Sequence, residues 1–241
     1  GGMSAPGSQP IPEPASAAPA PPSEADIAAA KAAVAKTPGD SAAWFRLGGL
    51  MHAAGRKQEC LEAIKKAVEI GPATEGRLMN LAIAYSDLYL FPEAIATYER
   101  LLKGNPANAR AWNNLGNIAM RRGEFDRAIG YFEKAIGADP GYLLAYYRMG
   151  YMLKRTGRRD EAAAAFKHVV ETPPQSAYEQ VVRTDTLYQL GSLALDSGAL
   201  EQAVEILTEV VGIAPDHPLA HYALAQALIR QGNPDAAKEQ L

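Results

Sequence analysis

Residues 109–140 read ARAWNNLGNIAMRRGEFDRAIGYFEKAIGADP, and the pattern of this stretch recurs along most of the chain. Its last residue, Pro140, belongs to a series of prolines that follow one another at a constant step of 34 residues. The other members of the series are Pro38, Pro72, Pro106 and Pro174. An ordinary globular core requires no such period, so the spacing indicates stacked copies of one helix–turn–helix unit.

Numbering each repeat from one to 34 brings similar residues to the same position. Positions eight and twenty are always small, and positions four, seven and twenty-four are mostly bulky. Small residues let the two helices of a repeat approach closely, where a larger side chain would cost about 1–3 kcal/mol. Glycine at position fifteen of most repeats permits the left-handed turn that ends the first helix. Repeats one to six begin at Ser41, Glu75, Ala109, Leu143, Thr184 and Pro218.

This W/Y-x-x-L-G pattern, with A, F and P following later, resembles the tetratricopeptide repeat family over about residues 24–241. The clearest copy is AWNNLGN at 111–117, followed by GEFD at 123–126 and by Ala128-Ile129. The resemblance implies an all-α fold, a right-handed α-solenoid superhelix of helix–turn–helix repeats whose first helices line a concave groove. Members of the family generally bind peptides or proteins in that groove.

The sequence also predicts the structure of the regions outside the regular repeats. Residues 1–23 are rich in proline and alanine, and we expect a disordered or extended tail, or else a ligand-like strand in a groove of this or a neighbouring copy. Residues 24–38 are expected to form an N-terminal half-repeat helix, capped by Ser23 or Asp26. The array then covers 41–241, with an insertion at 177–183 that lengthens the first helix of repeat five, either as a simple extension or as a lip of the binding face. Repeat six is cut short at Leu241, so we expect a longer parent protein or packing of this end on another copy.

Composition excludes several classes of function. The net charge of −3 and a pI near 5.9 argue against nucleic-acid binding, and the absence of a run of 18 apolar residues argues against a membrane span. Cys60 is the only cysteine, so an internal disulfide is impossible. The alanine-rich composition fits a bacterial protein. Gly1-Gly2-Met3 resembles a cloning remnant. The sequence therefore leaves the compartment open between cytoplasmic and periplasmic, with or without the removal of a targeting or anchor segment.

The sequence contains no motif of a catalytic site. It has no G-x-S-x-G, H-E-x-x-H or G-x-x-x-x-G-K and no zinc-binding Cys/His spacing. His217 and His221 are four residues apart, but the first precedes its helix and the second occupies the aromatic position four, so both are expected to be structural. We therefore expect no enzymatic activity, no metal and no cofactor.

The resemblance places a binding groove at positions two, five, six, nine, twelve and thirteen of the first helices. Amides there can pair with a peptide backbone, tyrosine faces can pack against proline rings, and arginines can bind carboxylates. The candidate groove residues are Asn80, Arg110, Asn113, Asn114, Asn117, Arg121, Tyr147, Arg148, Tyr151, Arg155, Tyr188 and Gln189.

Some members of the family clamp the C-terminal carboxylate of chaperones with a set of polar residues over three repeats: Lys or Asn, Asn, and Lys or Arg. Only Asn114 and Arg148 match that set here, while Met79, Ile83 and Leu144 replace polar members. The sequence therefore argues against the clamp function.

The leading functional hypothesis is a non-catalytic scaffold that binds an extended, perhaps proline-rich, peptide segment of a protein partner. One alternative is an assembly module, in which the tail or the shortened last repeat docks on another copy. The other is a substrate-recruiting arm of a larger enzyme, such as a glycosyltransferase that carries similar repeats.

Overall fold

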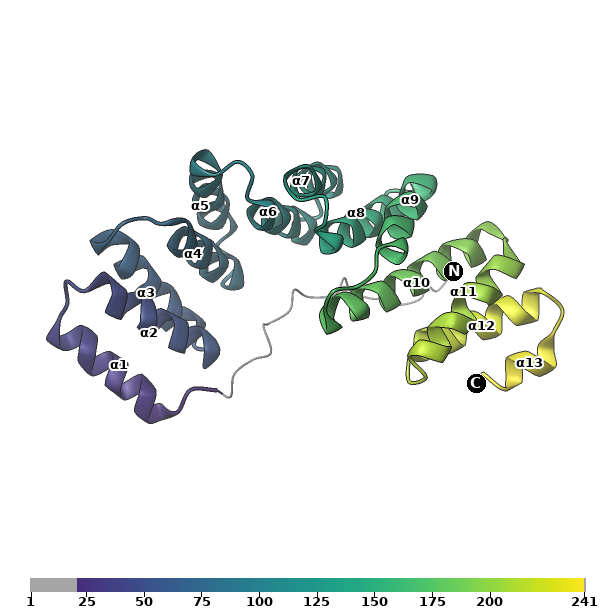
Figure 1. Ribbon diagram of the computed structural model, residues 1–241, viewed down its shortest axis with the longest axis horizontal. Helices are drawn as coiled ribbons and strands as arrows, with labels where there is room; N and C mark the ends of the chain where they lie inside the picture. Colours follow the sequence, from purple (N-terminus) through teal and green to yellow (C-terminus); the bar gives the residue numbers. More distant parts are fainter. Residues whose placement is uncertain (1–20, 241) are drawn as a thin grey trace. The chain divides into compact units, whose positions relative to one another are not determined.

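The computed structural model describes residues 21–240, and this part of the chain is built from thirteen helices without a β-strand (Figure 1). The all-α prediction is confirmed. The expectations for residues 1–20 lie outside the described residues. No helix in the described part is both long enough and apolar enough to cross a membrane.

The helices fall into two compact units. The N-terminal unit holds α1–α6 and the C-terminal unit holds α7–α13, except that Gly137–Asp139 at the end of α7 group with the N-terminal unit. The N-terminal helices are α1 (Glu24–Lys36), α2 (Ser41–Ala53), α3 (Lys57–Ile70), α4 (Glu75–Asp87), α5 (Phe91–Gly104) and α6 (Ala109–Arg121). The C-terminal helices are α7 (Phe125–Ala138), α8 (Leu143–Arg155), α9 (Arg159–Glu171), α10 (Ala177–Ser197), α11 (Leu200–Ile213), α12 (Pro218–Arg230) and α13 (Pro234–Lys238).

In most repeats the two helices begin differently. All first helices except α8 are capped by a side chain: the carboxylate of Asp40 accepts hydrogen bonds from the amides of Ala42 and Ala43 at the start of α2. Thr74, Asn108, Ser176 and His217 cap α4, α6, α10 and α12 in the same way. The second helices α3, α5, α9 and α11 have no side-chain cap, whereas the Asn233 side chain caps the short α13. Helix α1 carries a capping box, in which Ser23 and Asp26 each accept the other's backbone amide.

A tight left-handed turn joins the helices within each repeat. At Gly55, for example, φ is 71°, and the amide of Arg56 reaches back to the carbonyl of Met51 at 2.9 Å, which is the six-to-one bond of a Schellman motif. Repeat two is the exception, because Tyr89 takes this position with φ of 60°. The same closing bond is present, from the Leu90 amide to the Tyr85 carbonyl at 2.9 Å. This backbone conformation costs a residue other than glycine about 1–2 kcal/mol.

In repeats four and five, the close approach of the two helices depends on glycine at position eight. A Cβ added at Gly150 would lie 2.6 Å from Cε1 of Phe166, and one added at Gly191 would lie 2.7 Å from Cγ of Leu207. Phe166 and Leu207 occupy position twenty-four of the same repeats and are fully buried. The small residue at position eight therefore makes room for the bulky residue at position twenty-four of its own repeat.

Three repeats are also linked to the preceding repeat by a hydrogen bond from position four. The indole Nε1–H of Trp44 donates to the carbonyl of Pro38 at 2.9 Å, and that of Trp112 donates to the carbonyl of Pro106 at 2.8 Å. In repeat six, Nε2 of His221 lies 2.8 Å from the carbonyl of Pro215. The closing proline thus provides both a helix stop and an acceptor for the next repeat.

The 21-residue helix α10 is longer than the other first helices because residues 177–183 form its first two turns. Arg183 fixes this extension: its Nε donates to the carbonyl of Val170 at 3.1 Å, and its guanidinium lies 3.8 Å from the Glu209 carboxylate. Val182 is buried and Val181 is exposed. The extension therefore packs on α9 and α11 and adds exposed apolar surface to α10.

Candidate functional site

We use "first-helix face" for the surface formed, within each unit separately, by positions two, five, six, nine, twelve and thirteen of the first helices. In the N-terminal unit, Asn80, Arg110 and Arg121 are exposed on α4 and α6, and Asn117 is half-buried. Asn113 and Asn114 are buried. The structure thus separates side chains that a partner can reach from side chains that serve the fold.

The two buried asparagines take part in contacts within the unit. Nδ2 of Asn114 donates to the Tyr98 hydroxyl at 3.1 Å, and Nδ2 of Asn113 lies 3.4 Å from Oδ1 of Asn114. The Asn114 amide also lies 3.8 Å from Sδ of Met79. Tyr98 is itself almost fully buried on α5, so this amide connects three helices and holds α6 in register with α4 and α5.

In the C-terminal unit the predicted residues are more strongly buried. Arg155 is exposed and Tyr188 is half-buried. The guanidinium of Arg155 lies over the Phe125 ring at 4.8 Å, and the ring of Tyr188 lies 5.1 Å from that of His217. The remaining four, Tyr147, Arg148, Tyr151 and Gln189, are buried.

A polar network within this face includes Lys154, at groove position twelve, and Asp185, at position two, which the sequence-based candidate set lacked. The hydroxyl of Tyr147 donates to Oδ2 of Asp185 at 2.5 Å. Nζ of Lys154 donates to Oε1 of Gln189 at 3.2 Å and to Oγ of Ser192 at 3.0 Å. These bonds join α8 to α10, so the network positions the two helices that carry the C-terminal part of the face.

Burial changes the ionisation of both charged groups in the network. Desolvation raises the pKa of the Asp185 carboxyl above its ordinary value, although the hydrogen bond from Tyr147 opposes the shift. Desolvation also lowers the pKa of Lys154, and the charges of Asp196 and Asp185 oppose that shift. Each charge at neutral pH is therefore held at a cost to the folded state.

We expect Asp185→Asn to be more stable than the original chain at pH 7, with an advantage that shrinks in acid. The raised pKa means that the folded state binds the Asp185 proton more tightly than the unfolded chain does, so acidification through that pKa stabilises the original chain. The gain is complete below the ordinary value of 3.8. Urea unfolding at several pH values between 7 and 4 measures the difference, with Glu205→Gln, an exposed carboxylate on α11, as control. An advantage that grows in acid would contradict this account of Asp185.

The two histidines of repeat six and the buried Cys60 serve the local structure. Nδ1 of His217 accepts the amide of Ala220 at 3.1 Å, and the two ring nitrogens of His221 face Pro215 and Gln240. Burial raises the pKa of the Cys60 thiol to about 11, which keeps it protonated at neutral pH. Among the described residues, no group of three or more His, Cys, Asp or Glu side chains could hold a metal ion.

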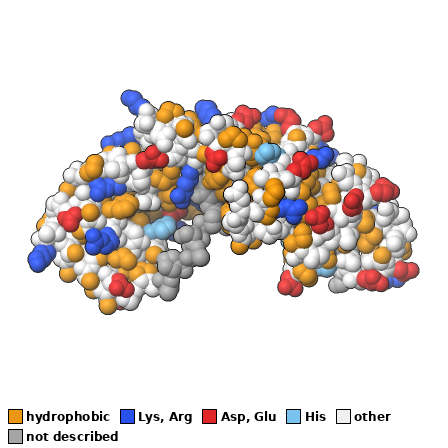
Figure 2. Space-filling model, in the orientation of Figure 1, with side chains coloured by type: hydrophobic (Ala, Val, Ile, Leu, Met, Phe, Trp, Pro, Cys, Tyr) orange, Lys and Arg blue, Asp and Glu red, His pale blue; other side chains and the backbone are white. Residues whose placement is uncertain are grey.

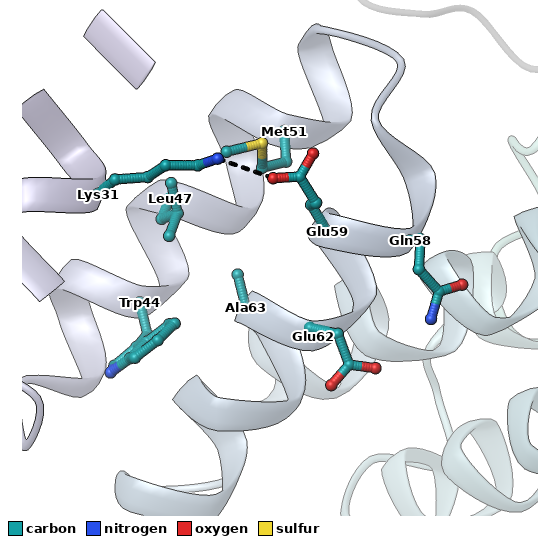
Figure 3. Close-up of a pocket in the computed structure, with 8 residues that line it drawn as sticks. All are labelled: Lys31, Trp44, Leu47, Met51, Gln58, Glu59, Glu62 and Ala63. Atoms are coloured by element: carbon teal, nitrogen blue, oxygen red, sulfur yellow. Dashed lines mark hydrogen bonds and ion pairs between the residues drawn. The ribbon is translucent and has the colours of Figure 1, made fainter. Parts of the chain in front are cut away.

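A pocket of about 210 Å³ lies among α1, α2 and α3 (Figure 3). Trp44, Leu47, Met51 and Ala63 supply its apolar lining, and the Lys31–Glu59 ion pair at 2.9 Å crosses it. Its volume is below the range of about 300–1,000 Å³ typical of ligand pockets. Seven of the 13 residues of α1 are alanine, so we interpret the pocket as space that short side chains leave unfilled.

Charge is distributed unequally along the chain. Residues 21–124 contain 13 Lys and Arg against 11 Asp and Glu, a net charge of +2, whereas residues 125–241 contain 11 against 15, a net charge of −4. On the face shown in Figure 2, acidic side chains accordingly gather over the C-terminal helices. Long-range electrostatics therefore favours an anion near the N-terminal unit over one near the C-terminal unit.

Sequence reasoning missed three exposed apolar side chains: Tyr89 in the turn of repeat two, and Tyr222 and Ile229 on α12. A signal existed for Tyr89, because repeat two lacks the glycine that the other repeats have at position fifteen. Tyr222 and Ile229 occupy positions five and twelve of repeat six, which belong to the first-helix face.

One family model described as tetratricopeptide repeat matches residues 27–74 and 79–143. A second model with the same description matches residues 119–183 and 194–241. The chain belongs to the tetratricopeptide repeat family. Tetratricopeptide arrays are typically modules for protein–protein interaction, and this chain is a scaffold of that class. A search of curated proteins finds no match to the sequence.

Solved tetratricopeptide structures share the fold. A crystal structure of MamA is 28% identical, with a TM-score of 0.57, and the match covers 60% of this chain and 85% of MamA. YrrB, described as "a TPR protein with an unusual peptide-binding site", is 22% identical with a TM-score of 0.61, over 82% of this chain and 98% of YrrB. A tetratricopeptide repeat protein from Parabacteroides merdae is 17% identical with a TM-score of 0.65, over 83% of this chain and 77% of that protein.

Proposed function

We propose that the first-helix face of this tetratricopeptide chain binds an extended peptide segment of a protein partner and catalyses no reaction on it. The observation that carries the proposal is the set of exposed polar side chains on α4 and α6, namely Asn80, Arg110 and Arg121. An amide can pair with a peptide backbone, and arginines can bind carboxylates bidentately. The expected ligand is therefore an extended segment with at least one acidic group.

The buried candidates have a supporting role in this proposal. Asn114 connects α6 to α4 and α5, and Tyr147 and Gln189 join the network between α8 and α10. A face whose helices are fixed in this way loses little conformational entropy when a ligand binds. Within the C-terminal unit by itself, the half-buried Tyr188 offers a flat surface on which a proline can pack.

We expect Arg110→Glu to weaken peptide binding at least about tenfold, because it replaces a cation on the face with a repelling charge. The probe is a set of peptides selected by the original chain from a random phage-displayed library, and their affinities are measured by isothermal titration calorimetry. Arg100→Glu is the matched control, because it makes the same charge change on the exposed side of α5. If no peptides are enriched, or if both variants bind them as the original chain does, the proposed face is wrong.

A second candidate function, self-assembly, is favoured by α12. Tyr222 and Ile229 are 52% and 54% exposed and lie seven residues apart, which places them on one side of the helix. Two exposed apolar side chains in such register are typical of a helix that packs on another surface. Sedimentation velocity over a range of concentrations distinguishes the candidates, since a strict monomer rules out assembly through α12.

A further inference from the structure

Tyr89 combines an unfavourable backbone with an exposed side chain. Its φ of 60° occurs at the position where Gly55, Gly123, Gly157 and other turn glycines have φ of 71–87°. The side chain is 70% exposed, so burial of the ring does not offset the cost of the conformation. Strained, exposed residues of this kind occur preferentially at functional sites.

The Tyr89 ring is nevertheless held in place. The guanidinium of Arg121 lies 5.8 Å from its centroid, and the Phe91 ring meets it edge-on at 5.8 Å. Nη1 of Arg121 also lies 3.5 Å from the Ser86 carbonyl. The neighbouring Leu90 is exposed as well. We call the surface formed by Tyr89, Leu90 and Arg121 the edge patch; it offers an aromatic face, an apolar side chain and a cation.

The N-terminus of α1 lies at the same edge of the N-terminal unit as this patch. Nη1 of Arg56, in the turn after α2, is 3.7 Å from the carboxylate of Glu24 at the start of α1. Lys57 follows Arg56 directly, and its Nζ lies 3.4 Å from the carbonyl of Asp87 at the end of α4. Ser23 and Tyr89 are therefore separated along this edge by about two helix spacings, or roughly 20 Å.

The chain itself contains a segment with complementary chemistry. Residues 10–14 read Pro-Ile-Pro-Glu-Pro, and Glu13 is the only ionisable side chain among residues 1–20. Proline rings pack well on aromatic faces, and a carboxylate pairs with an arginine. The ten residues from Glu13 to Ser23 can span at most about 35 Å, which exceeds the separation along the edge.

We infer that residues 10–14 dock on the edge patch of their own chain, with the Glu13 carboxylate on Arg121 and proline rings against Tyr89. These residues lie outside the described part of the structure. Arg121 is also at position thirteen of the first-helix face, so the docked segment occupies one end of that face and competes with a partner there. The inference concerns the edge patch and stands independently of whether a peptide binds at Arg110.

Paramagnetic relaxation enhancement in the full chain tests this docking. Ser16→Cys provides the site for a nitroxide label, because the native Cys60 thiol is buried and has a raised pKa. We expect the amide signals of Tyr89, Leu90 and Arg121 to lose most of their intensity and to recover when the nitroxide is reduced. Labelled chains diluted with unlabelled isotope-enriched chains should not show the loss, because docking is within one molecule.

Variants link the effect to the proposed contacts. Tyr89→Gly relieves the backbone conformation, so it keeps the fold while removing the aromatic face, and it should restore the edge-patch signals. Glu13→Gln should restore them in part. Tyr222→Ala, an exposed tyrosine in the other unit, is the matched control and should leave the intensity loss unchanged. Intensity loss that persists in Tyr89→Gly, that appears only in the mixed sample, or that is absent from the edge patch would overturn the inference.

Discussion

We expect Phe166→Ala to lower the free energy of unfolding of the C-terminal unit by about 3–5 kcal/mol. Phe166 has an exposed fraction of 0% and fills the space against Gly150. Truncation to alanine removes the buried ring and leaves a cavity, because α8 and α9 cannot close together without moving the whole hairpin. Urea unfolding followed by far-ultraviolet circular dichroism measures the loss.

Lys167→Ala is the control for this substitution, since Lys167 is the exposed neighbour of Phe166 on the same helix. A surface change of this kind should remain within about 0.5 kcal/mol of the original chain. Equal effects of the two substitutions would mean that Phe166 does not form the core of repeat four.

The adjacent glycines of α2 should respond in opposite directions to alanine. A Cβ at Gly48 would lie 2.3 Å from Cδ1 and 2.6 Å from Cγ1 of the buried Ile64, so Gly48→Ala should destabilise the N-terminal unit by about 1–3 kcal/mol. No atom lies within 4 Å of a Cβ added at Gly49. Gly49→Ala should therefore stabilise by about 0.5–1 kcal/mol, because it restricts the unfolded chain and favours the helix.

Thermal or urea unfolding of the two variants checks this pair directly. Each variant serves as the control for the other, because the same methyl group is added one residue apart on the same helix. Two changes of the same sign would show that close packing of α2 against α3 does not depend on glycine at position eight.

Most of the fold could be predicted from the sequence, because the restrictive positions are local and recur in every repeat. Gly150 and Phe166 illustrate this: a small residue at position eight and a bulky residue at position twenty-four are needed wherever two helices meet at this distance. One comparison of repeats thus gives the helix pairs without knowledge of long-range contacts. The family match then confirms the tetratricopeptide class.

The candidate site was harder to predict, since position in a repeat does not determine whether a side chain is accessible. Arg110 and Asn113 are both groove positions of α6, yet the first is exposed and the second is buried. Likewise, the pairing of Tyr147 with Asp185 depends on contacts between different repeats. Pattern analysis compares equivalent positions, so it does not report such pairings between unlike positions.

The hydrogen bonds from Trp44 and Trp112 to the prolines before them give the array a direction. Each bond runs from a repeat to the residue that closes its predecessor. Deleting repeats from the C-terminal end leaves every remaining indole N–H with its proline carbonyl acceptor. Deleting the repeat before an indole removes that acceptor and leaves the indole N–H without its hydrogen bond. Shortened or lengthened descendants of such a chain should therefore arise more easily by loss or gain at the C-terminal end.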